Sequence, residues 1–117
     1  MSSIYPAATP EIARKRREWS PRQSDAFEAF SKAAFANGAL PAKIKQIIAV
    51  AIAHVTQCPY CINGHTKAAL RAGATPDELM EAIWVAAEMR AGAAYAHSTM
   101  MIATAMEAAE KSAPSRA

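Results

Sequence analysis

Aromatic residues are scarce in this sequence: Phe, Trp and Tyr make up 7% of its 117 residues, whereas about a quarter of the residues are Ala. The length argues for a single domain. Ala favours helices but buries little surface, so a chain of this size and composition gains little stability from a core of its own. The composition therefore predicts a homo-oligomer, in which further copies of the chain complete the core.

Long apolar segments are also missing. The longest stretch without Asp, Glu, Lys or Arg contains Gln46 to His65, and its polar side chains interrupt the about 20 apolar residues that a membrane-spanning helix needs. The N-terminus carries no basic segment followed by an apolar one, as a signal peptide would. We therefore expect a cytoplasmic protein that does not bind a membrane.

Basic residues are concentrated in one cluster. The chain has 13 Lys and Arg against 10 Asp and Glu, a formal charge of +3, and four of the basic residues run from Arg14 to Arg17. Such a cluster can bind nucleic acid, but Glu11 and Glu18 flank it and no pattern of stacking aromatic residues follows. We expect no nucleic-acid partner.

Start and stop signals divide the chain into successive helices joined by short turns. Apolar residues recur three and four positions apart from Ile44 to Val55, and Thr75-Pro76-Asp77-Glu78 has the pattern of a capping box. Ser20 is a candidate cap for a helix that starts at Pro21, and Gly92 either breaks the last helix or allows close packing. The predicted class is all-α, with an N-terminal arm at 1–19, one helical domain at 20–112 and a frayed tail at 113–117.

The motif that indicates chemistry is Cys58-Pro-Tyr-Cys61-Ile-Asn-Gly-His65. If a helix starts at Pro59, both thiols lie at its N-terminus, where free backbone N–H groups and the helix dipole favour a thiolate. His65 follows Cys61 by four residues and shares its helix face. One thiol can be oxidised to a sulfenic acid and the other can condense with it. The motif thus predicts a Cys58–Cys61 disulfide that a dithiol reductant reopens.

Other interpretations of the same residues remain open. Two Cys on an Ala-rich helix can be inert small hydrophobic residues. His54, Cys58, Cys61 and His65 also offer four ligands of the types that zinc accepts, so a redox-sensing or zinc-holding oligomer without enzymatic activity is an alternative. All four lie within twelve residues across a helix break, unlike the two separated knuckles of structural zinc sites. We expect neither a metal nor another cofactor.

Three features together resemble the carboxymuconolactone decarboxylase / alkylhydroperoxidase D-like superfamily, over roughly residues 40–110. They are the apolar helix from Ile47, the Cys-x-x-Cys-x-x-x-His motif and the Ala-Leu-Arg-Ala-Gly-Ala-Thr that follows. The resemblance implies a helical bundle that assembles into trimers or hexamers. In the branch with the Cys pair it implies reduction of a hydroperoxide by a dithiol, with Cys61 as the peroxidatic thiol, Cys58 as its partner and His65 in a proton relay. A lyase or isomerase on the same scaffold is the alternative activity.

Two positions depart from the pattern of this superfamily. Gln46 stands where the peroxidase relay has a Glu, and an amide can hydrogen-bond to a His but cannot take a proton at neutral pH. Tyr60 stands between the two Cys, where the prototype has a His, and a phenol is a poor base near pH 7. His54 and Glu88 are further candidates for supporting the proton transfer.

Overall fold

The structure, a computed structural model, describes residues 4–112, and these residues form helices without any strand. Five helices follow one another: α1 (Pro10–Trp19), α2 (Pro21–Phe35), α3 (Ala42–Thr56), α4 (Pro59–Arg71) and α5 (Pro76–Lys111). The predicted all-α class is confirmed. The expected frayed tail, 113–117, lies outside the described residues.

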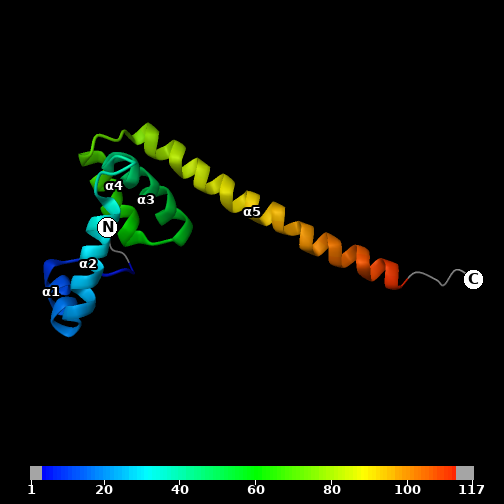
Figure 1. Ribbon diagram of the computed structural model, residues 1–117, viewed down its shortest axis with the longest axis horizontal. Coiled ribbons are helices and arrows are strands. Elements are labelled where there is room, and N and C mark those ends of the chain that lie inside the picture. Colours follow the sequence, from blue (N-terminus) through cyan, green and yellow to red (C-terminus); the bar gives the residue numbers. More distant parts are fainter. Residues whose placement is uncertain (1–3, 113–117) are drawn as a thin grey trace, which may run out of the picture.

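A small bundle and one long projecting helix give the molecule an elongated shape (Figure 1). The radius of gyration of the Cα atoms is 22.0 Å, whereas a compact chain of this length has about 13 Å. Helix α3 packs against α4 and α5, while α1 and α2 form a hairpin beside them. Helix α5 continues through Gly92 without a break, and its second half extends away from the bundle.

The core is as small as the composition predicts. Four residues from α3, α4, α5 and the α4–α5 turn form one buried cluster: Val50, Ala69, Ala74 and Leu79. Ile47 and Ile83 pack against this cluster and are partly buried. Because two of the four buried residues are Ala, the cluster removes little apolar surface from water. No helix in the described part of the chain is both long and apolar enough to span a membrane.

Side-chain and backbone bonds fix the turn that leads to the Cys motif. Helix α3 ends at Gln57, whose φ of 58° is left-handed, and the Cys58 N–H donates to the Ala53 carbonyl at 3.1 Å. From α5, the Arg90 Nη1 donates to the Val55 carbonyl at 2.7 Å. These bonds satisfy carbonyl groups that a helix C-terminus leaves free, and they set the position of Cys58.

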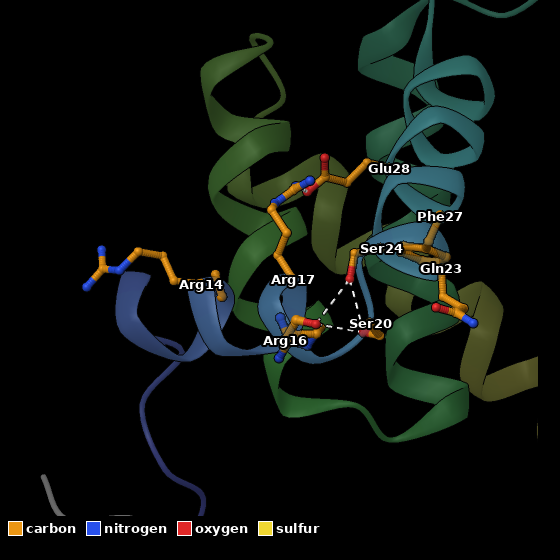
Figure 2. Close-up of a pocket in the computed structure, with 9 residues that line it drawn as sticks. Arg14, Arg16, Arg17, Ser20, Gln23, Ser24, Phe27 and Glu28 are labelled. Carbon is orange, nitrogen blue, oxygen red and sulfur yellow. Dashed lines mark hydrogen bonds and ion pairs between the residues drawn. The ribbon is translucent and has the colours of Figure 1, made fainter.

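The hairpin of α1 and α2 differs from the sequence expectation in one cap. Ser20 takes the predicted N-cap position of α2, but its hydroxyl donates to the Arg16 carbonyl at 2.6 Å and makes no capping bond to α2 (Figure 2). Arg17 points toward Glu28 in the same view and pairs with both Glu28 and Asp25. The basic cluster is therefore partly neutralised within the hairpin, around a hollow of about 590 Å³.

The capping box at the start of α5 is confirmed, and its removal is expected to destabilise the protein. Thr75 Oγ1 accepts the Glu78 N–H at 3.1 Å, and Glu78 Oε1 accepts the Thr75 N–H at 2.9 Å. Thr75→Ala should lower the free energy of unfolding by about 1 kcal/mol, measured by urea denaturation. Thr99→Ala, the same change within α5, should change it by only a few tenths of that amount. Equal effects of the two substitutions would contradict a capping role.

Candidate active site

Both thiols lie at the N-terminus of α4, as the motif predicts. Cys58 is the N-cap residue, Pro59 is the first helical residue, and the Cys58 Sγ accepts the Cys61 N–H at 3.2 Å. Both side chains are half-buried and both are free thiols. One sulfur therefore receives a backbone hydrogen bond at the positive end of the helix dipole, and the second sulfur stands one turn along.

The two thiols differ in acidity. The pKa of Cys58 is lowered, because its sulfur accepts hydrogen bonds from the Cys61 thiol first, and then from the backbone N–H groups of Cys61 and Tyr60. The pKa of Cys61 is raised, because its proton is held by Cys58 and because the thiol is partly desolvated. As the pH rises, Cys58 is therefore the first of the pair to become a thiolate.

His65 is held in one orientation by two contacts from other helices. Its Nδ1 lies 2.8 Å from the Gln46 Oε1 on α3. Its ring stacks on Phe35 of α2, with the ring centroids 5.0 Å apart and the planes inclined by 22°. Because an amide oxygen only accepts, the contact places the imidazole proton on Nδ1 and leaves Nε2 as a lone pair that can take a proton.

Cys61 and His65 line one open pocket of about 440 Å³. Three helices supply its walls: α2 through Ser31, Lys32 and Phe35, α3 through Gln46, and α4 through the remaining residues, Tyr60, Cys61, Gly64, His65 and Ala68. The structure thus brings together the Cys61 thiol, the His65 imidazole and the Gln46 amide that the sequence singles out.

A sequence profile of the carboxymuconolactone decarboxylase family matches residues 21–111. The chain belongs to this family. A relative from Paracoccus denitrificans, described as uncharacterised protein 4 in the cox locus, is 67% identical over 79 residues, which are 68% of this chain and 71% of the relative. An uncharacterised protein of Cupriavidus necator is 39% identical over 90 residues, which are 75% of this chain and 80% of that protein.

Solved structures show the same family fold. A carboxymuconolactone decarboxylase family protein from Legionella pneumophila, solved in its apo form, is 35% identical with a TM-score of 0.65, over 68% of this chain and 70% of that one. A protein from Methanobacterium thermoautotrophicum is 36% identical with a TM-score of 0.68, over 72% of this chain and 94% of that one. The resemblance stated from the motif is therefore confirmed for the carboxymuconolactone decarboxylase family.

Tyr60 departs from the superfamily prototype, and in this carboxymuconolactone decarboxylase family member it binds the segment before α1. Its hydroxyl donates to the Pro6 carbonyl at 2.8 Å, and its ring meets Tyr5 edge-on, with the centroids 6.0 Å apart. Tyr5 and Pro6 therefore lie against the start of α4 in the same chain. The phenol proton is engaged in this bond rather than directed to the thiols.

Two further candidates do not reach the pocket. The His54 Nδ1 lies 2.7 Å from the Val50 carbonyl of its own helix, and His54 lines a separate hollow with Pro59 and Asn63. Glu88 is exposed on α5, which packs on α3 and supplies no residue to the pocket of Cys61. No contact in the described part of the structure supports a role for either residue in the proton transfer.

The four possible zinc ligands do not converge. Among residues 4–112, no group of three or more His, Cys, Asp or Glu side chains is placed to hold a metal ion. The Nδ1 atoms of His54 and His65 face a backbone carbonyl and an amide oxygen, respectively.

Sequence reasoning missed Phe35 and Lys32. Both lie near the end of α2, where they line the pocket of Cys61, and Phe35 stacks on His65 of α4. The apolar spacing of α2 did not identify this contact, because it emphasises Phe27 and Phe30, which are 67% and 69% exposed in the chain. No local sequence pattern identifies a residue that lines a site about thirty positions further along the chain.

The opposite pKa shifts of the two thiols predict opposite effects of removing each sulfur. Cys61→Ala should raise the pKa of Cys58, because the strongest hydrogen bond to its thiolate is lost. Cys58→Ala should lower the pKa of Cys61, because the acceptor that holds its proton is lost. The pH dependence of alkylation by iodoacetamide measures each value in the variant that keeps one thiol. A Cys58 pKa that falls in Cys61→Ala, or a Cys61 pKa that rises in Cys58→Ala, each relative to the wild type, would contradict the assignment.

Proposed function

We propose that the protein reduces a hydroperoxide through a dithiol–disulfide cycle of Cys58 and Cys61, with His65 as the group that transfers the proton. The observation that supports this proposal most directly is the pair of free thiols joined by the Cys61 N–H to Cys58 Sγ bond at the start of α4. His65 lines the same pocket as Cys61, with its Nε2 free to accept a proton.

In the first step, the Cys61 thiol turns its proton away from the Cys58 sulfur, which holds it in the resting protein, and passes it to the Nε2 of His65. The Cys61 sulfur then attacks the terminal oxygen of the hydroperoxide, an S–O bond forms and the O–O bond breaks. The alkoxide that leaves takes a proton from the imidazolium and becomes an alcohol. Cys61 is now a sulfenic acid, and the peroxide has gained two electrons.

In the second step, the Cys58 thiolate attacks the Cys61 sulfur. An S–S bond forms and the S–O bond breaks, and the hydroxide takes a proton from solvent and leaves as water. The lowered pKa of Cys58 suits this step, because the resolving sulfur is already a thiolate when the sulfenic acid appears. A dithiol reductant then reopens the disulfide through a mixed disulfide and returns both thiols.

Gln46 supports this cycle as a positioning residue. Its Oε1 holds the Nδ1 proton of His65 at 2.8 Å and so fixes which ring nitrogen is free. An amide adds no charge to the pocket, so the imidazolium formed in the first step has no carboxylate beside it to stabilise it. The proton is therefore returned readily to the leaving alkoxide.

The proposal is tested by following the hydroperoxide and the dithiol together. Purified protein, cumene hydroperoxide and dithiothreitol should give loss of one hydroperoxide for each dithiothreitol oxidised, at a rate proportional to the protein concentration. A protein whose thiols are blocked beforehand with iodoacetamide is the control. The same rate with blocked and unblocked protein would overturn the proposal.

We also propose that the chain works as a homo-oligomer, a trimer or a hexamer. A groove of about 430 Å³ between α3 and α5 is lined by apolar residues alone. Large apolar side chains along the two helices are at least one third exposed: Ile48, Ile52, Val55, Trp84, Val85, Met89, Tyr95, Met100, Met101, Ile102 and Met106. Monomeric proteins rarely expose an apolar surface of this extent.

Light scattering should give a mass of three or six 12.5 kDa chains. Ile52→Asp should reduce this mass to that of a single chain, because a carboxylate would be buried without a partner in the α3–α5 groove. Circular dichroism shows whether the helices persist in the variant. A wild-type protein that is a monomer at all concentrations measured would contradict this part of the proposal.

A further inference from the structure

The pocket of Cys61 carries one formal charge, and it is positive. Of the nine described residues that line it, only Lys32 is charged at neutral pH when His65 is neutral. The side chain that faces His65 from α3 is the neutral amide of Gln46, so the wall beside His65 adds no negative charge. The field at the mouth of the pocket therefore favours an anion.

Lys32 is also one of two lysines that have no partner among residues 4–112. Three of the six lysines, Lys15, Lys43 and Lys111, pair with glutamates, and Lys45 donates to the Ala36 carbonyl. Among the described residues, neither Lys32 nor Lys67 has a hydrogen bond or an ion pair. Of these two, only Lys32 lines the pocket. Its ammonium group is thus available to a ligand held there.

The rest of the pocket suits a small apolar body. Phe35 and Tyr60 contribute aromatic rings to the walls, and Ala68 contributes a methyl group. Phe35 is already fixed by its stacking on His65, at 5.0 Å between the ring centroids. A ligand between these rings would lie between the Cys61 sulfur on α4 and Lys32 on α2.

We infer that this site selects organic hydroperoxides that carry a carboxylate, and that Lys32 is the residue that binds the carboxylate. The inference rests on the proposed peroxidase function and names the substrate class for it. The carboxylate pairs with the Lys32 ammonium group, the apolar body lies against Phe35 and Tyr60, and the hydroperoxide reaches Cys61. The chemistry of the two steps given above is unchanged.

A matched pair of substrates tests this inference. Cumene hydroperoxide and its para-carboxylate differ only by one charged group, and dithiothreitol as a neutral reductant assigns any preference to the oxidant. In 10 mM buffer, kcat/KM should be about fivefold higher for the para-carboxylate than for cumene hydroperoxide, because the KM of the carboxylate is lower. Lys32→Gln should remove this difference between the two substrates. Lys32→Arg should retain it, and so should the control Lys67→Gln. Added salt at about 0.5 M should reduce it in the wild type.

An alkylation experiment separates failure of this inference from failure of the proposed function. In protein carrying Cys58→Ser, Cys61 is the one remaining thiol, and its rates with iodoacetate and iodoacetamide compare an anionic and a neutral reagent without any peroxide. Lys32→Gln should lower the iodoacetate-to-iodoacetamide ratio by about threefold at low salt, and Lys67→Gln should not. An unchanged ratio overturns the role of Lys32. A lowered ratio in a protein that turns over neither hydroperoxide keeps the anion site and rejects the peroxidase proposal.

Discussion

Replacing Cys61 by Ser is expected to reduce hydroperoxide turnover to the rate of the reaction between hydroperoxide and dithiothreitol alone. A serine hydroxyl is not ionised at neutral pH and cannot accept the peroxide oxygen as a sulfenic acid does. Without dithiothreitol, Cys58→Ser should instead consume about one hydroperoxide per chain and then stop, because Cys61 can be oxidised but no thiol is present to resolve it. Trapping with dimedone, followed by mass spectrometry, should find the adduct on Cys61.

The two serine variants control for each other, since both place a hydroxyl at the start of α4. Ser is a good N-cap residue, so Cys58→Ser should leave the helix content and the mass in solution unchanged. The reverse pattern would contradict the assignment: a dimedone adduct on Cys58 in the Cys61→Ser variant, with none on Cys61 in the other. This comparison is a strict test of the assignment. Because the pKa of Cys58 is lowered, the Cys58 thiolate is more abundant than the Cys61 thiolate in the resting protein.

Loss of the imidazole is expected to have the second largest effect. His65→Ala should lower kcat/KM for the hydroperoxide by about a hundredfold, because the Cys61 proton and the leaving alkoxide lose their acid–base partner. His97→Ala, an exposed His in the projecting half of α5, should change the rate less than twofold and serves as the control. Peroxide consumption at several pH values separates the loss of a proton acceptor from a loss of substrate binding.

Variants of Gln46 refine this prediction. Gln46→Ala removes the bond to the His65 Nδ1 and should lower the rate by about tenfold, less than loss of the ring itself. Gln46→Glu places a carboxylate beside the His65 ring, where it favours the imidazolium form. The acidic limb of the pH–rate profile should therefore move to higher pH. A rate in His65→Ala equal to that of the wild type would remove His65 from the mechanism and would leave Gln46 without a role.

The fold was largely predictable because its signals are local. Pro59 and Pro76 follow N-cap residues that bond to the backbone three positions on, so each helix start depends on four consecutive residues. The placement of Cys58 at an N-cap follows from the same rule. Ser20 shows the limit of such rules, since the nearby Arg16 carbonyl competes for its hydroxyl at 2.6 Å.

The site was predictable only along α4. Cys58, Cys61 and His65 share one helix, so their spacing places them together. The walls come from other helices: Gln46 from α3, and Phe35 from α2. Gln46 was found through the resemblance to a superfamily whose relay residue has that position. Phe35 and Lys32 were not found, because the packing of α2 on α4 depends on contacts that no local pattern encodes.

The same reasoning applies to Tyr60. The sequence places it between the two thiols, but its hydroxyl bonds to the Pro6 carbonyl across more than fifty residues, a contact that no local pattern predicts. The composition likewise predicts a small core and exposed apolar surface, but it does not say where on the molecule that surface lies. Which parts of α3 and α5 carry that surface depends on how the two helices pack, which leaves Ile52 and Val85 exposed in the groove between them.

The most direct test of the central claim is the mass of the intact chain after reduced protein receives one equivalent of hydroperoxide with no reductant. The mechanism predicts that each chain loses two hydrogens, that a peptide map joins Cys58 to Cys61, and that dithiothreitol restores the original mass. A chain of unchanged mass, with both thiols still open to alkylation and the hydroperoxide unconsumed, would contradict it.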